Sequence, residues 1–272
     1  MRKGSVELSP LMSRPAAFTP PARAFFFLGM VFSCATMVGL AAAVPSAQES
    51  GPPKHFFPLT RGTYWVYQGT VDWFDQAKDK TSEAKVSLKM TVERVFENES
   101  IVFAELQGYP ADLNFTAGDA HPSRWMLIES SSHRVFLREL NPGTRLPAPG
   151  SPPSAFDSFM TDDDLLFEWP LARGKKYCDA ESAKREDEMY CWIVESEERK
   201  NLDAVTGAGW GSAPVFTITY RTNPDDTQIE LSPGIGIIAY RYNHHGTTAA
   251  TDVKLTEFHA VPEKSPSTRG AR

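Results

Sequence analysis

The stretch KVSLKMTV, residues 85–92, alternates polar and apolar side chains at every position. Its apolar members are Val86, Leu88, Met90 and Val92. Because successive side chains of a β-strand point to opposite faces, this period places one face on a core and the other in water. The stretch therefore predicts a half-buried strand, and it is the clearest guide to the fold.

Runs of the same kind lie on both sides of it, joined by short polar connections. The tetrapeptides at 97–100 and 130–133 predict hairpin turns. No long run has the period of an amphipathic helix, and residues 154–160 predict one short helical turn. The sequence thus predicts a mainly β fold, an antiparallel meander that forms a curved sheet, half-barrel, barrel or sandwich. Besides 85–92, the expected strands are 63–74, 101–106, 125–129, 134–140, 192–197, 215–221, 235–242 and 253–258.

The N-terminal residues predict export from the cytoplasm. Residues 24–44 (AFFFLGMVFSCATMVGLAAAV) are apolar and end in small residues, and four basic residues precede them. This is the pattern of a secretory signal peptide, here residues 1–47, with cleavage between Ala43 and Gln48. Two alternatives are a membrane anchor formed by 24–44, which is just long enough to span a bilayer, and acylation of Cys34. The expected location is periplasmic or extracellular.

The rest of the chain reads as a single β domain over residues 55–261. A polar, Pro-rich linker (48–54) precedes it, and a flexible tail (262–272) follows it. The Pro- and Gly-rich residues 141–155 predict an irregular exposed loop inside the domain. Without the signal, 24 Lys+Arg remain against 33 Asp+Glu, a formal charge near −9. That surface argues against nucleic acid as a partner.

Two cysteines, Cys178 and Cys191, remain once the signal is removed. In an oxidising compartment such a pair is usually bonded. The twelve residues between them are highly charged and must be solvated, so the pair predicts a long hairpin closed by a disulfide. In the loop-entropy picture such a bond stabilises the fold by roughly 3 kcal/mol. A redox-active dithiol and a two-cysteine metal site are the alternatives.

Some polar clusters resemble metal sites. His244 and His245 precede Gly246, which permits a turn where both imidazoles could bind one ion, but a polar hairpin end is the preferred interpretation and no metal is expected. Residues 162–164 are three aspartates that could supply oxygen ligands to calcium, although they lack the spacing and turn glycine of an EF-hand loop. A solvated acidic loop is the simpler interpretation, and we expect no cofactor.

Carboxylates beside tryptophans allow a carbohydrate-cleaving site, since the separation of a catalytic acid pair is spatial and not sequential. The pairs are Asp72 with Trp73 and Glu168 with Trp169, and Trp125 and Trp210 could stack on sugars. The sequence has no Gly-x-Ser-x-Gly, His-Glu-x-x-His or Walker A pattern, which lowers the expectation of a common hydrolase or nucleotide enzyme.

Two stretches carry a resemblance to a known group of proteins. They are FFPLTRGTYWVYQG at 56–69 and PGIGIIAYRYNHHGTTAATDVKLTEF at 233–258. They resemble uncharacterised secreted or lipoprotein-like bacterial proteins that open with a Phe/Tyr-Pro-Leu…Gly…Trp-x-Tyr motif and close with Pro-Gly-Ile/Val-Gly before a strand. The resemblance implies an extracytoplasmic β fold, in some cases similar to the half-barrels of lipoprotein carriers. It brings no catalytic residues.

The leading hypothesis is an exported β protein that is not an enzyme and binds an apolar ligand or a protein partner through a concave sheet face. The candidate walls are Trp65 and Tyr67 on one strand and Tyr240 and Tyr242 on another. The partner stays open, with a lipid and an envelope protein as the candidates. Membrane association is expected only if 24–44 is retained or Cys34 is acylated. The alternatives are a secreted hydrolase acting on carbohydrate and a structural or assembly component of the envelope.

Overall fold

The structure, a computed structural model, describes residues 55–119, 121–207 and 210–262. The predicted signal peptide with its anchor segment and Cys34, the linker at 48–54 and residues 263–272 of the tail lie outside the described residues. None of the helices in the described part of the chain reaches the length and hydrophobicity of a membrane span.

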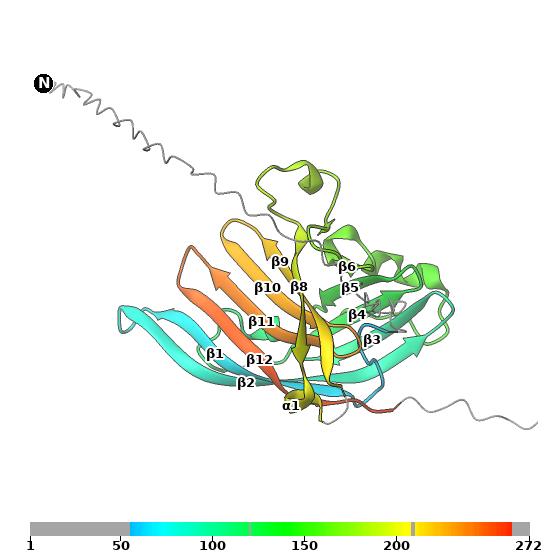
Figure 1. The fold of residues 1–272 in the computed structure, drawn as a ribbon, viewed down its shortest axis with the longest axis horizontal. Coiled ribbons are helices and arrows are strands. Elements are labelled where there is room, and N and C mark those ends of the chain that lie inside the picture. Colours follow the sequence, from blue (N-terminus) through cyan, green and yellow to red (C-terminus); the bar gives the residue numbers. More distant parts are fainter. Residues whose placement is uncertain (1–54, 120, 208–209, 263–272) are drawn as a thin grey trace, which may run out of the picture. The chain divides into compact units, whose positions relative to one another are not determined.

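Twelve strands form one antiparallel sheet in the described ranges, which confirms the predicted mainly β fold (Figure 1). The first strand, β1, lies in the middle of the sheet, and the next five strands follow it in order to one edge, at β6. The chain then crosses to the other edge at β7. The remaining strands lead back in order to β12, which pairs with β1. The strands are β1 (Tyr64–Asp75), β2 (Lys80–Glu97), β3 (Ile101–Gln107), β4 (Arg124–Ser130), β5 (Arg134–Glu139), β6 (Leu165–Glu168), β7 (Lys176–Tyr177), β8 (Trp192–Asn201), β9 (Ser212–Arg221), β10 (Asp225–Ser232), β11 (Gly236–His244) and β12 (Ala249–His259).

The sheet curls into a nearly closed barrel (Figure 1). Its two edge strands are β6 and β7, and they contact each other. The Tyr177 hydroxyl on β7 donates a hydrogen bond of 2.7 Å to the carbonyl oxygen of Glu168 on β6. This contact spans the seam of the barrel. The sequence did not predict β6 or β10 as strands, it placed β7 only as one stem of the disulfide hairpin, and it predicted only the central part of β2.

Large aromatic side chains fill the interior. Trp65 and Tyr67 of β1 are completely buried, and each has a polar atom that needs a partner. The indole N–H of Trp65 donates to the carbonyl of Ile235 (2.6 Å), and the Tyr67 hydroxyl donates to that of Ile237 (2.9 Å). These two bonds satisfy buried donors and tie β1 to the chain at the start of β11.

Residues 55–58 form a strap between the two halves of the sheet. The backbone N–H groups of Phe56 and Phe57 both donate to the buried Glu129 carboxylate on β4, at 3.0 and 2.8 Å. On the other side, the Phe56 carbonyl accepts from the N–H of Gly234, in the turn between β10 and β11. The Phe57 ring packs on Gly236, where a Cβ would lie 2.6 Å from it. The strap therefore needs a glycine beneath its ring.

The predicted irregular loop at 141–155 ends in the 3₁₀ helix η2 (Pro153–Phe159), which covers part of the sheet. Phe156 of η2 is buried against Phe103 of β3, with ring centroids 5.6 Å apart. Arg138 of β5 donates to the backbone carbonyl of Ser158 in the same helix. Four successive residues of β4, Met126 to Glu129, are buried, so this part of the strand has no face in water. The remaining helices are η1 (Pro110–Leu113), η3 (Asp162–Asp164), η4 (Ser182–Lys184) and α1 (Asp203–Thr206).

Candidate functional site

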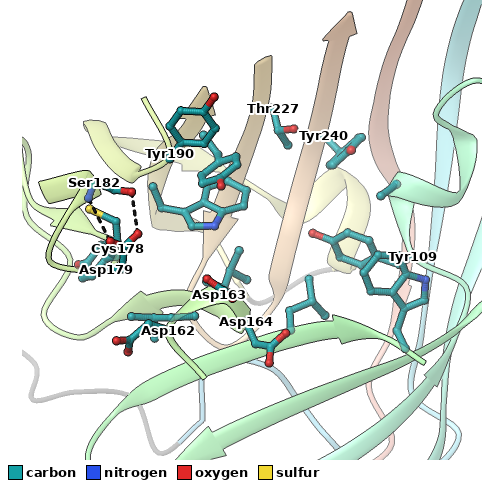
Figure 2. Close-up of a pocket in the computed structure, with 18 of the residues that line it drawn as sticks. Tyr109, Asp162, Asp163, Asp164, Cys178, Asp179, Ser182, Tyr190, Thr227 and Tyr240 are labelled. Atoms are coloured by element: carbon teal, nitrogen blue, oxygen red, sulfur yellow. Dashed lines mark hydrogen bonds between the residues drawn. The ribbon is translucent and has the colours of Figure 1, made fainter. Parts of the chain in front are cut away.

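A cavity of about 470 Å³ lies against the seam strands β6 and β7. Figure 2 shows most of the residues that line it. Its lining comes from the connection between β3 and β4, from β4 to β6, from the loop after β7 and from β8 to β11. Seven of the nineteen described residues that line the cavity are aromatic. Those contributed by the described residues are Tyr109, Trp125, Tyr177, Tyr190, Trp192, Tyr220 and Tyr240.

The carboxylate of Asp112 fixes two of these rings. It accepts hydrogen bonds from the backbone N–H of Tyr109, the backbone N–H of Ser123 and the indole N–H of Trp125, each at 2.9 Å. The Tyr109 and Trp125 rings lie 4.6 Å apart as a result. Asp112 stands in η1, so this short helix positions one wall of the cavity.

Tyr240 of β11 extends the same wall. Its ring meets that of Tyr109 edge-on, with centroids 6.1 Å apart. The Asn114 side-chain amide donates to the Tyr240 hydroxyl (2.8 Å), and the Asn114 carbonyl oxygen accepts from the Thr251 hydroxyl (3.1 Å). Burial raises the pKa of Tyr240 and of Tyr109, so both phenols stay neutral at physiological pH.

The facing wall is built around the disulfide. Cys178 and Cys191 are bonded, which confirms the sequence prediction, and they close the loop between β7 and β8. Tyr190 at the end of that loop lies on the opposite side of the cavity from Tyr109 (Figure 2). Its backbone has a positive φ of 64°, and its N–H donates to the carbonyl of Arg221 (2.7 Å). The loop is thereby held at the cavity.

Two further rings continue this facing wall. Trp192 of β8 and Tyr220 of β9 lie on neighbouring strands, with centroids 5.1 Å apart. Burial raises the pKa of Tyr220, and the nearby Asp163 and Asp179 carboxylates add to the shift. These two carboxylates therefore lie within electrostatic reach of the same phenol.

Four aspartates stand at the cavity, and they differ in their partners. Asp162 forms an ion pair with Arg134 (3.0 Å), and Asp164 accepts from the Thr161 hydroxyl (2.7 Å) and lies 3.4 Å from Arg138. In Figure 2, Asp163 and Asp164 lie between Tyr190 and Tyr109. Asp163 makes no hydrogen bond or ion pair with any other residue in the described ranges.

Asp179, the fourth aspartate, caps the turn that begins the disulfide loop. It accepts from the Ser182 hydroxyl (2.6 Å) and from the backbone N–H groups of Ser182 and Glu181. These hydrogen bonds, the Ser182 hydroxyl first, lower the pKa of Asp179. The group is therefore a fixed negative charge at neutral pH. Among the described residues that line the cavity there is no Lys, Arg or His.

The predicted ligand walls are separated in the structure. Of the four residues, Tyr240 lines the cavity, whereas Trp65 and Tyr67 lie in the filled interior. Tyr242 lies outside the cavity lining, donates from its hydroxyl to the Asp225 carboxylate (2.6 Å) and packs edge-on against Phe115. The alternating pattern predicted that these side chains point inward. It could not tell which of them pack in the core and which line the cavity.

The two histidines lie at the end of the β11–β12 hairpin. His244 Nδ1 contacts Asp225 at 2.7 Å, and His245 Nδ1 lies 3.4 Å from the Asn243 side-chain nitrogen. In the ranges that the structure describes, no group of three or more His, Cys, Asp or Glu side chains is placed to hold a metal ion, the aspartates at 162–164 included.

The carboxylate and tryptophan pairs proposed for carbohydrate cleavage do not line the cavity. Glu168 lies near Arg134 and Lys175, and Trp169 packs on Phe56 and Phe216. Trp125, proposed as a sugar-stacking residue, does line the cavity, whereas Trp210 is partly exposed against Phe258.

The sequence did not single out Tyr109, Tyr177, Tyr190, Trp192 or Tyr220 as site residues. One signal was present: an aromatic residue stands on the outer side of each disulfide cysteine, and Tyr190 precedes Cys191. Because the disulfide joins the two ends of that loop, it brings these rings together at one side of the cavity.

Neither a family model nor a curated protein sequence matches this chain. Two solved structures are similar to it. One, from Bacteroides fragilis NCTC 9343, is provisionally described as an exported protein with a YmcC-like fold; the match has 14% identity and a TM-score of 0.38, and it covers 75% of this chain and 99% of that one. The other, from Parabacteroides distasonis ATCC 8503, is provisionally described as a lipoprotein; it has 14% identity and a TM-score of 0.34, and covers 77% and 100%. At these values the function has to be argued from the site itself.

Proposed function

We propose that this chain is an exported binding protein that holds a small molecule in the aromatic cavity and does not transform it. The observation that carries the proposal is the cavity of about 470 Å³ with seven aromatic side chains in its wall. Its volume lies within the range of small-molecule sites, which combine apolar walls with a few placed polar groups. Here the polar groups, besides the tyrosine hydroxyls, are Asn114, Ser182, Thr227 and the aspartates.

The proposed location outside the cytoplasm has two supports. The sequence from 24 to 44 has the pattern of a secretory signal. The bond between Cys178 and Cys191 is the state expected of a cysteine pair in an oxidising compartment. A periplasmic or extracellular protein fits both.

The state of the carboxylates supports binding over catalysis. A carboxyl that donates a proton to a substrate at neutral pH needs a raised pKa. The pKa of Asp179 is lowered instead, and Asp162 and Asp164 face Arg134 and Arg138. The cavity therefore presents the fixed charge of Asp179 and the neutral phenols of Tyr109 and Tyr240 to a ligand.

The test is a binding titration with a neutral fluorescent probe, N-phenyl-1-naphthylamine, on the oxidised mature protein. Trp192→Ala removes a ring from the cavity, and Trp210→Ala removes a tryptophan that lies outside it, as a matched control. We expect saturable binding that Trp192→Ala weakens at least about tenfold and Trp210→Ala leaves unchanged. Equal binding by both variants, or none by the parent, would contradict the proposal.

A second candidate is a secreted hydrolase that acts on carbohydrate. The observation in its favour is that Trp125, Trp192 and Asp163 line one cavity, since sugar sites also combine aromatic rings with carboxylates. A panel of glycans incubated with the oxidised protein decides between the two. Product formation that Asp163→Asn abolishes would favour the hydrolase, and retention of intact glycans with saturable probe binding would favour the binding protein.

A further inference from the structure

The charged residues that line the cavity are all acidic. Four aspartates and no basic residue line it within the described ranges. Arg134 and Arg138 offset the charges of Asp162 and Asp164 from outside the lining. Asp179 has only neutral donors, and Asp163 has no hydrogen-bond or ion-pair partner among the described residues. Two carboxylate charges are therefore left without a counter-ion.

The rings beside these carboxylates add to the same field. The face of an aromatic ring is its negative pole, and it attracts a cation that lies within about 6 Å of its centroid. Trp192 and Tyr220 stand together, with ring centroids 5.1 Å apart, and line the same cavity as Asp163 and Asp179. One cation–π contact of this kind is present within the protein. The Arg185 guanidinium lies 5.1 Å from the centroid of the Tyr190 ring, which lines the cavity.

From these two features we infer that the ligand of this cavity is an organic cation, an ammonium group that carries methyl or ring carbons. The inference rests on the proposed function and narrows it to a class of ligand. Aromatic faces suit the apolar surface of such a cation, and the carboxylates of Asp163 and Asp179 balance its charge.

Other ligand classes fit the lining less well. An anion would meet four carboxylates without a basic partner in the lining. A bare metal ion needs several ligand atoms that converge, and no group of three or more metal-ligating side chains is present in the described part of the chain. A neutral apolar molecule would gain nothing from the charges of Asp163 and Asp179.

The experiment compares three probes of nearly the same shape at pH 6: 4-(trimethylammonio)phenol, neutral 4-tert-butylphenol and anionic 4-tert-butylbenzoate. Binding is followed by isothermal titration calorimetry on the oxidised mature protein. We expect the cation to bind about tenfold more tightly than its neutral isostere, and the anion to bind least. Added salt should weaken binding of the cation and leave that of the neutral probe unchanged.

Two variants localise the effect. Asp163→Asn should lower the affinity for the cation several-fold, to near that of the neutral probe, and leave the neutral probe unaffected. Asp157→Asn makes the same change at an exposed position outside the cavity and should alter neither affinity. The affinities of the cation and of its neutral isostere are also compared on the parent protein. The test therefore does not depend on either variant being stable.

The outcomes separate the two proposals. Equal affinity of the cation and the neutral probe, or a cation affinity that Asp163→Asn does not change, overturns the inferred ligand class and leaves the binding function standing. If none of the three probes binds, and N-phenyl-1-naphthylamine does not bind either, the proposed function itself is overturned and the ligand class with it.

Discussion

Single polar residues position the cavity wall, and Asp112 is the clearest case. Its carboxylate receives three N–H donors from Tyr109, Ser123 and Trp125. The sequence shows an acidic residue four positions after Gly108, and nothing in that pattern indicates that it organises two rings. The role follows from the return of β4 beside η1, which only the three-dimensional structure shows.

Replacing Asp112 tests this role. In Asp112→Ala the three donors lose their acceptor, and we expect the free energy of unfolding to fall by about 2 kcal/mol. Urea unfolding followed by far-UV circular dichroism measures it. Asp119→Asn, an exposed residue in the same connection, should stay within about 0.5 kcal/mol of the parent. An Asp112→Ala variant as stable as that control would refute the assignment.

At the scale of elements, hydropathic alternation found the strands that have one wet face. It predicted 85–92 within β2 because Val86, Leu88 and Met90 face inward. It stopped short of the true end because a bulge between Val92 and Arg94 shifts the register. It missed β10, where Ile229 and Leu231 are the inward apolar residues after a polar start. That strand is held by backbone pairing on both edges, which leaves little trace in the sequence.

The strap at 55–58 predicts a specific sensitivity at Gly236. Gly236 has φ +99°, and a Cβ there would lie 2.6 Å from the Phe57 ring. Gly174 has a similar φ of +80° with nothing within 4 Å, so it isolates the backbone effect. We expect both Gly→Ala variants to lose about 1–2 kcal/mol for the left-handed backbone. Gly236→Ala should lose about 1–3 kcal/mol more for overpacking.

The comparison is read from urea midpoints of the two variants and the parent. Gly236→Ala combined with Phe57→Leu, which shortens the ring, should recover part of the additional loss. If Gly236→Ala and Gly174→Ala are equally destabilised, the Phe57 ring moves aside at no measurable free-energy cost. That result would contradict the predicted overpacking at Gly236.

The disulfide loop links stability to binding. Cys178→Ser with Cys191→Ser opens a loop with a sequence separation of 13 and should lower the free energy of unfolding by about 3 kcal/mol. Because the loop carries Tyr190 and Asp179 to the cavity, the affinity for the fluorescent probe should also fall. Thermal unfolding and the probe titration measure the two effects. A loss of stability with unchanged affinity would place the loop outside the binding site.

At the scale of the whole described domain, the sequence predicted the fold class and the disulfide but only fragments of the site. Tyr240 and Trp125 were named, and both line the cavity. Trp65 and Tyr67 share the alternating pattern of Tyr240 and lie in the core instead. Alternation shows which face of a strand a residue occupies. It does not show how far along the barrel axis that residue lies. That distance depends on the stagger between strands, and the cavity assembles from strands and loops far apart in the chain.

The distribution of lowered carboxyl pKa values predicts how the domain responds to acid. Hydrogen bonds or ion pairs hold the pKa of Asp179, Asp187 and Glu188, all on the disulfide loop, below the ordinary value. Burial raises the pKa of Asp225, but hydrogen bonds from Tyr242 and His244 outweigh it, and the net direction is down. A carboxyl with a lower pKa in the folded state binds protons preferentially in the unfolded state. Its stabilisation is therefore complete above the ordinary pKa and is lost as the pH falls through the folded value.

We therefore expect the urea midpoint to be nearly constant from pH 7 to pH 5 and to fall steeply below about pH 4. Asp225→Asn should start lower at pH 7, because it weakens the bonds from Tyr242 and His244, and should lose less between pH 5 and pH 3 than the parent. Asp157 is exposed, and its side chain receives no hydrogen bond from the rest of the described chain. The control variant Asp157→Asn should therefore follow the parent curve. If Asp225→Asn instead parallels the parent down to pH 3, the acid sensitivity of the domain arises elsewhere than in this hydrogen-bonded cluster.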